Sequence, residues 1–554
     1  MRFQGLLRGQ LTPRDGTEPT RGERTGAGPL RLFLAFVLVN AMLLAPVWVF
    51  YGGVGPLWLS LEAGVLVGIF ALVPPSRWSR YAAIAAAVLV LAMTIVGLGD
   101  TALRLSLSRP LNLYVDIWLL RSVWHLAVGT LGAPVATAAF VLVPVALAAV
   151  TALLAWLLQP LQARRSALAT RLSAVALLAF TTAGLTAERV RSLEYHVDTP
   201  AARTLVEQGR TFVRTLGERD RFAAALETIP DSYADVPGLL SRLEGRDVVL
   251  GFIESYGMTA LDDPRYRPVV GPRLDDFEQR MAEAGLYLVT GSLIAPTQGG
   301  QSWLAHGSML SGIWLDNQIR YDMLLGSGRE TLIDDFQRAG HRTVAVMPAI
   351  VLPWPEGDRF GYDETLVRRD IDYAGPPLNW VEMPDQFTWS FVQRRLLGKG
   401  NGPVFAEVGL ISSHAPWTPI LDVLDWDRVG DGSVFSRWEN AGEAPEQLWL
   451  DTDRVREHYA LSIEYAVHAM ASFAERYVDQ GTLLIALGDH QPAPLITGDG
   501  APWTVPVHVV SRDPELVRPF LEWGFVEGAW PDADHEPLGM DYFRDWFVRA
   551  YSGK

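Results

Sequence analysis

Five long apolar stretches in the first third of the chain constrain its fold more than any other feature. They lie at roughly 32 to 51, 57 to 74, 81 to 98, 134 to 158 and 169 to 186. Each has about 18 to 25 residues, enough for a helix to cross roughly 30 Å of hydrocarbon. The first is too long, and begins too late in the chain, for a cleaved signal peptide. We therefore expect a transmembrane domain with five spans at residues 30–186.

Arginine residues predict which connecting segments face the cytoplasm. They gather before the first span, between the second and third, and between the fourth and fifth, as Arg2, Arg8, Arg14, Arg21, Arg24, Arg31, Arg77, Arg80, Arg164, Arg165 and Arg171. By the positive-inside rule these segments are cytoplasmic. Five spans that start from a cytoplasmic N-terminus place everything after about residue 187 on the outer, or periplasmic, face of the cell membrane.

Three segments outside the spans have distinct compositions. Residues 1–29 are polar and rich in glycine and arginine, which is typical of a disordered cytoplasmic arm. Residues 99–133 mix tryptophan and leucine with charged side chains, so we expect an amphipathic helix at the membrane interface, with an ordinary loop as the alternative. Residues 187–245 are charged and helix-prone, which predicts a helical linker.

The overall composition excludes several classes of protein. A chain of 554 residues is too long for one compact core. The formal net charge of −15 argues against nucleic acid as a partner, because phosphate binding requires clustered Lys and Arg. Cysteine is absent, so the chain has no disulfide, thiolate metal site or cysteine nucleophile. The absence of cysteine does not indicate the cellular compartment.

From about residue 246 onward, short apolar runs alternate with helix-like segments. The runs are V-V-L-G-F-I, L-Y-L-V-T, T-V-A-V-M, P-V-F-A-E-V-G-L-I, T-L-L-I-A-L and V-P-V-H-V-V. Strands separated by helices predict a mostly parallel sheet that is covered by helices on both faces. Residues 246–554 are therefore expected to form an extracytoplasmic α/β domain.

Three of these strand-like runs end at polar residues suited to metal binding. One run ends at Glu254, another at His414, and the third breaks at Gly488 to deliver Asp489 and His490. The carboxyl ends of strands in an open α/β sheet converge on one crevice. Carboxylate and imidazole side chains gathered there form a plausible divalent-metal site. Taken alone, Glu254 could equally well be a salt-bridged or capping residue as a metal ligand.

A glycine-rich turn precedes a candidate nucleophile. In P-T-Q-G-G-Q-S-W-L-A-H-G-S-M-L-S-G, Gly299 and Gly300 permit tight backbone geometry just before Ser302. The residues that follow have helical spacing, which places Ser302 near a helix N-terminus. Free N–H groups there favour an alkoxide and bind phosphate oxygens. The alternative is that Ser302 only caps the helix.

Three histidines need separate interpretations. His414 lies in the stiff loop I-S-S-H-A-P-W-T-P, where an imidazole can donate to phosphate or protonate a leaving group. His306 follows Ser302 by one helical turn and either lines the same site or packs within its helix. His508, inside V-P-V-H-V-V, is interpreted as a core histidine.

A further group of residues is assigned to substrate binding. Trp354 and Trp417, like Trp303 and Trp503, can stack on a sugar or glycerol, although tryptophan also anchors cores and membrane interfaces. Arg359, in W-P-E-G-D-R-F-G-Y-D, is a candidate for phosphate contact.

Together, the strand ending in Glu254, the glycine-flanked Ser302, His414 and G-D-H at residues 488–490 resemble the alkaline phosphatase and sulfatase superfamily. The resemblance implies that Glu254, Asp489 and His490 bind one divalent ion, with Mn²⁺ favoured over Mg²⁺ or Zn²⁺. It also implies that Ser302 is the fourth ligand and the nucleophile, and that His414 contacts the head group of the substrate.

The membrane anchor narrows the resemblance to lipoteichoic acid synthase and other phosphoglycerol transferases. The implied reaction moves a phosphoglycerol-type head group from phosphatidylglycerol to a glycan, polyol or lipid hydroxyl. Ser302 stands where such transferases carry Thr, which leaves transfer and hydrolysis both open. A sulfatase is disfavoured because S-W-L-A-H lacks the C/S-x-P-x-R signature, and the absence of cysteine fits phosphoethanolamine transferases of lipid A poorly. A catalytically inactive binding protein is the alternative of another class.

Overall fold

The computed structural model describes residues 27–52, 59–117, 123–124, 127–128, 132–159, 167–188, 197–229, 232–398, 400 and 402–553. These residues fall into two compact units. The helical unit comprises Met1–Leu98 and Trp124–Glu207, and the α/β unit comprises Gly99–Val123 and Gln208–Lys554. The expected cytoplasmic arm lies, up to residue 26, outside the described residues.

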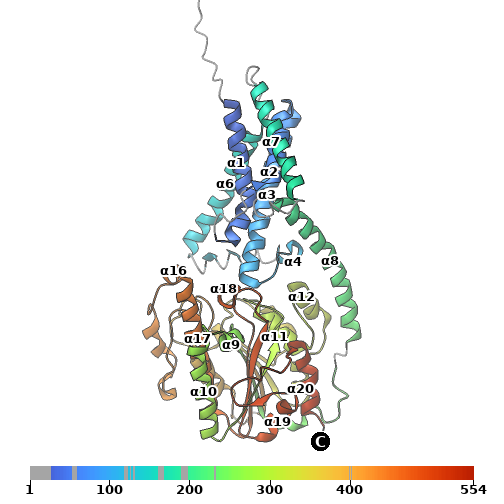
Figure 1. The fold of residues 1–554 in the computed structure, drawn as a ribbon. Helices are drawn as coiled ribbons and strands as arrows, with labels where there is room; N and C mark the ends of the chain where they lie inside the picture. Colours follow the sequence, from blue (N-terminus) through green and yellow to red (C-terminus); the bar gives the residue numbers. More distant parts are fainter. Residues whose placement is uncertain are drawn as a thin grey trace, which may run out of the picture. The chain divides into compact units, whose positions relative to one another are not determined.

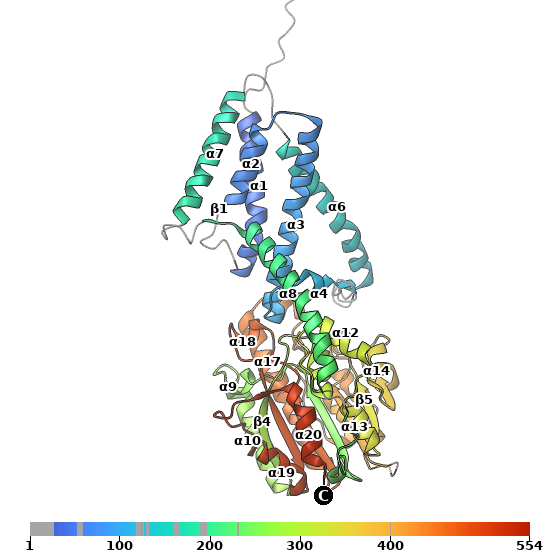
Figure 2. The same cartoon turned by 90° about the vertical axis from the view of Figure 1, so that its right-hand side faces the viewer.

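The helical unit contains the apolar helices that the sequence predicts (Figures 1 and 2). They are α1 (Ala27–Phe50), α2 (Leu61–Leu72), α3 (Arg77–Leu107), α6 (Ala133–Leu158) and α7 (Ala167–Glu188), and β1 (Leu59–Ser60) pairs with β2 (Val197–Asp198). Among the described residues, three helical segments are long and apolar enough to cross a membrane: Leu30–Phe50, Arg77–Leu107 and Ala133–Leu158. The apolar helices α2 and Arg171–Ala183 are shorter.

The second expected span is therefore not a full crossing within the part of the chain that the structure describes. The 12 residues of α2 extend only about 18 Å, against roughly 30 Å of hydrocarbon. Ser60 caps this helix by accepting a hydrogen bond from the Ala63 N–H, so the cap fixes where α2 begins. Residues 57 and 58, at the start of the expected span at 57 to 74, lie outside the described residues.

The segment expected at the membrane interface begins as the end of α3. This helix continues beyond the apolar stretch to Leu107, supported by an i,i+4 ion pair in which Arg104 Nε lies 2.7 Å from Asp100 Oδ2. The four-residue helix α4 (Leu113–Asp116) follows. The described part of residues 99–133 thus does not form one amphipathic helix, because charged pairing extends α3.

Residues 99–117 pack within the α/β unit. The long helix α8 (Pro200–Thr228), which occupies much of the expected linker at 187–245, donates from Gln208 Nε2 to the Leu111 carbonyl oxygen over 2.7 Å. Asn112 Nδ2 donates to Thr215 Oγ1 of the same helix over 2.8 Å. These contacts place the end of α3 and the following turn on the same body as the C-terminal domain.

A nine-stranded sheet forms the centre of the α/β unit. Its strand order is β10-β4-β9-β8-β3-β7-β5-β6, with β11 also paired to β4. The pairs β8-β3, β3-β7, β7-β5 and β5-β6 are parallel, whereas β9 runs antiparallel to β8 and β4. The sheet is therefore mixed, with a parallel centre. The strands are β3 (Asp247–Ile253), β4 (Tyr287–Ile294), β5 (Arg342–Met347), β6 (Glu364–Val367), β7 (Val404–Leu410), β8 (Thr482–Gly488), β9 (Thr504–Ser511), β10 (Val526–Glu527) and β11 (Leu538–Gly539).

Helices cover both faces of this sheet, as predicted (Figure 1). Val249 and Ile253 of β3 contribute to one apolar cluster, and Val248, Leu250 and Phe252 contribute to the other, since successive strand residues point to opposite faces. Helices α10 (Arg267–Glu283), α15 (Asp385–Arg395) and α17 (Thr452–Tyr477) supply the first cluster. Helices α11 (Ser302–Ser311), α13 (Leu332–Arg338), α19 (Pro514–Glu522) and α20 (Phe543–Tyr551) supply the second.

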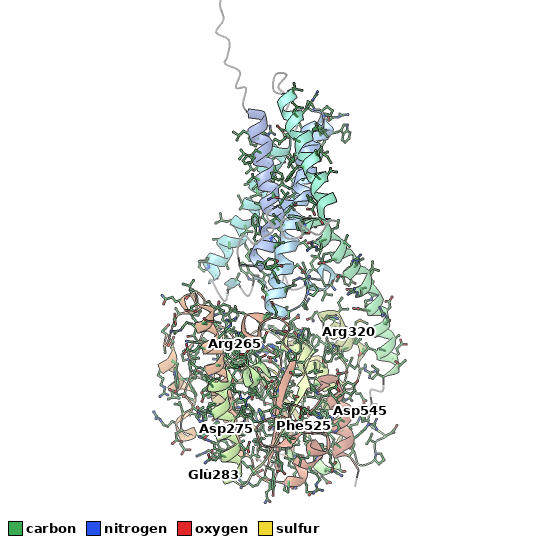
Figure 3. The ribbon with its side chains drawn as sticks, in the orientation of Figure 1. Arg265, Asp275, Glu283, Arg320, Phe525 and Asp545 are labelled. Carbon is green, nitrogen blue, oxygen red and sulfur yellow. The ribbon has the colours of Figure 1, made fainter. Side chains whose placement is uncertain are left out.

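Side chains fill the α/β unit throughout (Figure 3). Phe525, labelled there, is buried in the second cluster. Short helices complete the unit: α9 (Thr259–Asp262), α12 (Gln318–Ser327), α14 (Pro355–Phe360), α16 (Pro445–Leu448) and α18 (Pro494–Thr497). Short 3₁₀ helices lie at η2 (Ser241–Leu243), η3 (Arg368–Asp370), η4 (Trp426–Arg428), η5 (Ser433–Trp438) and η6 (Met540–Tyr542).

Candidate metal centre

The register of the sheet brings the predicted strand ends together. Ile253, the last residue of β3, pairs with Leu410 of β7 and with Gly488 of β8. The next residues along β3 and β8 are Glu254 and Asp489. Parallel strands in register thus deliver both carboxylates to one edge of the sheet, which is the convergence that the sequence predicts.

Ligand atoms from Glu254, Asp489 and His490 all lie within 4.8 Å of one another. His490 Nε2 lies 3.6 Å from Glu254 Oε1 and 3.6 Å from Asp489 Oδ2. Ser302 Oγ lies 3.3 Å from His490 Nε2 and 3.5 Å from Glu254 Oε2. The four side chains that the sequence singled out therefore form one cluster.

Ser302 is the first residue of α11, and Gln301 is the N-cap. The interpretation of Ser302 as a mere cap is therefore wrong. Gln301 has the left-handed values φ 65° and ψ 41°, and its side chain makes no capping hydrogen bond. At Gly299 (φ 75°), an added Cβ would lie 1.8 Å from the Ser106 carbonyl oxygen. The turn thus needs glycine at this position, and it presents Ser302 at the positive end of a ten-residue helix.

Hydrogen bonds hold the ligand side chains in fixed orientations. Asp489 Oδ1 accepts from the backbone N–H of Ser255 over 2.8 Å and of His490 over 2.7 Å. The Ser255 hydroxyl donates to Glu254 Oε1 over 2.8 Å. His490 Nδ1 donates to the Gln491 carbonyl oxygen over 2.9 Å, which leaves Nε2 to face the carboxylates. Ser255 itself has φ 55°, so the backbone beside Glu254 is strained.

The two carboxylates of the cluster, Glu254 and Asp489, are close together and shielded from solvent, so their negative charges oppose one another. Burial and the negative charge of Glu254 raise the pKa of Asp489 to about 6. Burial also opposes ionisation of Glu254, but the positive fields of His414 and His490 outweigh it and lower the pKa of that carboxyl. Burial likewise opposes the charge on His490, whereas Asp489 and Glu254 raise its pKa. A cation at the centre of the cluster would stabilise both carboxylates.

The donor set fits a divalent ion. Bonds of about 2.1 Å place tetrahedral ligands about 3.4 Å apart. Four separations within the cluster are 3.3 to 3.6 Å, and the ligand atoms of Glu254, Asp489 and His490 all lie within 4.8 Å of one another. Two carboxylates, one imidazole nitrogen and one hydroxyl oxygen suit Zn²⁺ or Mn²⁺, and a site with this many oxygen donors also admits Mg²⁺.

A cavity of about 560 Å³ opens beside the cluster. Of the residues assigned to substrate, it is lined by His306, Trp354 and His414, and also by Ser302 and Trp303. His414 Nδ1 donates to the Ala415 carbonyl oxygen, so its Nε2 stays available.

Two of the expected substrate contacts are not brought to this cavity. Arg359 is exposed on α14 and does not line it. Trp417 is buried, stacks on Trp449 and donates to the Ser413 carbonyl oxygen, so it supports the His414 loop instead. Trp503 lines a separate cavity of about 330 Å³ within the α/β unit.

His508 has the predicted place in the core. It is fully buried in β9 and hydrogen-bonds through its two ring nitrogens to Tyr256 and Thr290.

The sequence reasoning missed a buried carboxylate beside Ser302. Glu407 of β7 is 1% exposed and lies 2.7 Å from His306 Nδ1, while the Tyr362 hydroxyl donates to its other oxygen. The His306 ring also stacks on Phe252, with centroids 3.8 Å apart. The sequence does indicate this residue, because Glu407 is a charged residue inside the apolar run P-V-F-A-E-V-G-L-I, and a buried carboxylate requires partners.

No protein-family model and no curated protein matches the sequence of this chain. Several solved structures match this chain at low identity and with TM-scores below 0.5. A protein in the alkaline phosphatase superfamily from Vibrio parahaemolyticus has 14% identity, covering 60% of this chain and 74% of that one, with a TM-score of 0.37. The lipoteichoic acid synthase LtaP from Listeria monocytogenes has 11% identity over 61% and 78%, with a TM-score of 0.37. The zinc-bound C-terminal periplasmic domain of EptC from Escherichia coli has 12% identity over 56% and 83%, with a TM-score of 0.35.

Proposed function

We propose that this protein is a membrane-anchored, metal-dependent phosphotransferase that moves a phosphorylated head group from a phospholipid to an acceptor hydroxyl. The observation that supports the proposal is the Ser302 hydroxyl, held at a helix N-terminus 3.3 Å from His490 Nε2 and 3.5 Å from Glu254 Oε2. A nucleophile in contact with a metal-ligand set and open to a cavity is the arrangement that phosphoryl transfer requires.

The first step forms a covalent intermediate. Glu254, Asp489 and His490 would hold a divalent ion, which would supply Lewis-acid chemistry by making a nearby hydroxyl more acidic and polarising a phosphate oxygen. Ser302 loses its proton to solvent, and its Oγ bonds to phosphorus. The phosphorus–oxygen bond to diacylglycerol breaks, and His414 protonates the departing oxygen.

The second step regenerates the serine. The acceptor hydroxyl gives its proton to His414 and bonds to phosphorus, and the bond to Ser302 Oγ breaks. Backbone N–H groups at the start of α11 stabilise the negative phosphate oxygens in both steps. Hydrolysis is the same sequence with water as the acceptor, so a phosphodiesterase is the second candidate.

The sequence resemblance favours phosphatidylglycerol as donor and a glycan, polyol or lipid as acceptor, with Mn²⁺ as the ion. Membrane anchoring supports a lipid donor, since three described helices are long and apolar enough to span a bilayer. We propose that the α/β unit lies on the outer face of the cell membrane, as the arginine distribution predicts.

Mass spectrometry of the trapped intermediate tests the proposal. Full-length protein is incubated with Mn²⁺ and phospholipid vesicles without an acceptor, quenched in acid and digested. The Ser302 peptide is expected to gain the mass of the phosphorylated head group, and the Ser302→Ala variant is expected to gain none. An unmodified Ser302 peptide together with undiminished diacylglycerol release would remove the covalent step.

Two measurements separate the alternatives. Free head-group phosphate formed without an acceptor indicates a phosphodiesterase, whereas product that requires an added polyol indicates a transferase. Failure to bind any divalent ion at physiological concentrations would favour an inactive binding protein.

A further inference from the structure

The charged residues that line the cavity beside Ser302 are mainly acidic. Its lining includes the carboxylates of Glu254, Glu356, Glu407 and Asp489, and, among these described residues, no Lys or Arg. Proteins that bind anionic head groups or phosphate-rich acceptors use Arg and Lys for this purpose. The cavity outside the metal cluster is thus suited to a neutral or positively charged group.

Three of the four carboxylates already have partners in the α/β unit. Glu254 and Asp489 belong to the metal cluster, and Glu407 is held by His306 and Tyr362. Glu356 differs from them. Among the described residues, no hydrogen bond or ion pair joins its carboxylate to another side chain, although it is half-buried and lines the cavity. Its negative charge therefore faces the space where substrate binds.

Aromatic rings line the same space. Tyr321 and Phe360 line the cavity together with Glu356, and their ring centroids lie 6.2 Å apart. Trp354 also lines the cavity, and its ring lies against Gly357, where an added Cβ would be 2.4 Å from a ring carbon. The absence of a side chain at Gly357 thus leaves room for the Trp354 ring against the helix that carries Glu356.

Two further indole rings, those of Trp303 and Trp380, line the cavity. Trp303 follows Ser302 directly, and its Nε1 donates to Gln318 Oε1 over 3.0 Å, which fixes the ring. Trp380 packs beside His414, with centroids 6.5 Å apart. Both indoles line the cavity and remain more than a third exposed. Aromatic faces around an unpaired carboxylate attract a cation through the ring quadrupole and through direct charge pairing.

We propose that Glu356 and the surrounding aromatic rings bind an ammonium group in the donor's head group, so that the donor is a zwitterionic amino-alcohol phospholipid. The proposal rests on the proposed transferase function and changes the head group that the sequence resemblance suggested. The phosphate is held at the metal cluster and the start of α11, and the ammonium extends into the cavity toward Glu356. A primary ammonium such as that of ethanolamine can also donate hydrogen bonds to the carboxylate, whereas a quaternary ammonium such as that of choline relies on the rings.

Donor competition tests the proposal. Full-length protein with Mn²⁺ is given vesicles that contain phosphatidylethanolamine, phosphatidylcholine or phosphatidylglycerol with the same fluorescent acyl chains, and diacylglycerol release is measured. We expect kcat/KM to be about tenfold higher for one of the ammonium lipids than for phosphatidylglycerol. Phosphatidylglycerol as the preferred donor would overturn the proposal while leaving the transferase function standing.

The Glu356→Gln variant isolates the carboxylate. It is expected to lower kcat/KM for the ammonium lipid about tenfold and to change the rate with phosphatidylglycerol less than twofold. Asp358→Asn, an exposed change on the same helix, serves as the matched control and should alter neither rate. An equal loss with both lipids would assign Glu356 a structural role and contradict the proposal.

Binding of soluble head groups distinguishes failure of this proposal from failure of the transferase function. By calorimetry, the wild-type protein with Mn²⁺ should bind phosphoethanolamine or phosphocholine more tightly than glycerol 3-phosphate, and Glu356→Gln should remove the difference. Selective binding without any lipid cleavage would overturn the proposed reaction alone. Equal binding of all three compounds would overturn the ammonium site.

Discussion

His490 and Ser302 contribute differently to the cluster, and their replacements should separate metal binding from chemistry. His490 Nε2 lies within 3.6 Å of both carboxylates, so His490→Ala removes a central ligand. Ser302 supplies one peripheral oxygen. We expect Ser302→Ala to abolish turnover while leaving metal content nearly intact, and His490→Ala to weaken metal binding at least about tenfold. Elemental analysis after dialysis against Mn²⁺ measures the difference, and retained turnover in Ser302→Ala would exclude it as nucleophile.

The residues predicted from the sequence were those whose place depends on one strand or one turn. Glu254 and Asp489 end buried strands, and strand register alone brings them together. Glu356 and Arg359 lie on one short helix, and only the tertiary packing decides that Glu356 lines the cavity while Arg359 points to solvent. Glu407 was missed because five of the seven residues in its strand are apolar, so the run predicts a strand and not a site.

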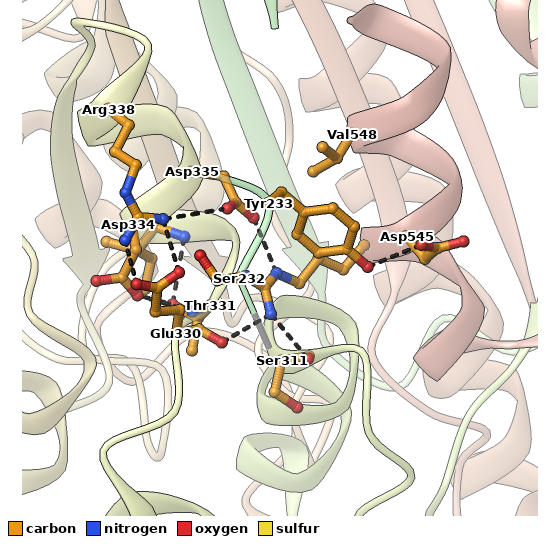
Figure 4. A network of polar contacts seen from close by, with 12 residues as sticks. Ser232, Tyr233, Ser311, Glu330, Thr331, Asp334, Asp335, Arg338, Asp545 and Val548 are labelled. Carbon is orange, nitrogen blue, oxygen red and sulfur yellow. Dashed lines mark hydrogen bonds and ion pairs between the residues drawn. The ribbon is translucent and has the colours of Figure 1, made fainter. Parts of the chain in front are cut away.

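At the scale of elements, a buried ion pair joins α20 to α13 (Figure 4). Arg544 Nε donates to Asp335 Oδ2 over 2.9 Å, and Nη1 donates to the Glu330 carbonyl oxygen over 2.7 Å. Neither Arg544 nor Asp335 is more than 1% exposed. Arg544→Met leaves the buried Asp335 carboxylate with only the weaker partner Arg338, whose Nη1 lies 3.9 Å from Asp335 Oδ1, and should lower the free energy of unfolding by up to about 3 kcal/mol.

The double variant Arg544→Met/Asp335→Leu should recover most of that loss, because no unpaired charge then remains in the interior. Denaturant titration of the three proteins measures the difference. A double variant as unstable as the single one would mean that the hydrogen bonds to backbone carbonyl oxygens, and not the charge pair, hold these helices together.

The buried imidazole of His508 in β9 should make the free energy of unfolding of the α/β unit depend on pH. Burial lowers the pKa of His508 to about 3, against about 6.5 in an unfolded chain. As pH falls below 6.5, the unfolded state binds a proton at His508 and the folded state does not. The contribution of His508 to the free energy of unfolding is therefore fully present above pH 6.5 and is lost as pH falls toward 3. This loss approaches about 1.4 kcal/mol per pH unit.

Comparison of wild type with His508→Gln between pH 6.5 and 4.5 isolates this contribution. Asp385 acts in the opposite direction, since burial raises its pKa to about 6 and its neutral form favours the folded state as pH falls. The slope of unfolding free energy with pH should be smaller in His508→Gln, whose amide can still bond to Tyr256 and Thr290. Equal slopes would contradict a neutral buried imidazole.

At the scale of the whole molecule, contacts within the α/β unit limit how the chain can cross a membrane. Leu111 and Asn112 hydrogen-bond to α8, so residues 99–117 and the described part of the chain after 208 lie on the same side of a membrane. The segment between them must cross an even number of times. Crossings by α1, α3 and α6 alone would put these parts on opposite sides, so α7 is expected to cross together with α6. This condition does not involve α2, which is shorter than a full span. We predict that α2 also crosses, which gives the five crossings expected from the arginine distribution.

Single cysteines test the five-crossing arrangement cleanly, since the chain has none of its own. Tyr51→Cys, Pro75→Cys and Asp499→Cys are placed at exposed positions before α2, before α3 and in the α/β unit. In intact cells a membrane-impermeant maleimide should label Tyr51→Cys and Asp499→Cys, and should label Pro75→Cys only after permeabilisation, because α3 separates Pro75 from the α/β unit. Labelling of Pro75→Cys together with Asp499→Cys before permeabilisation would require an even number of crossings between them, and the five-crossing arrangement would be wrong.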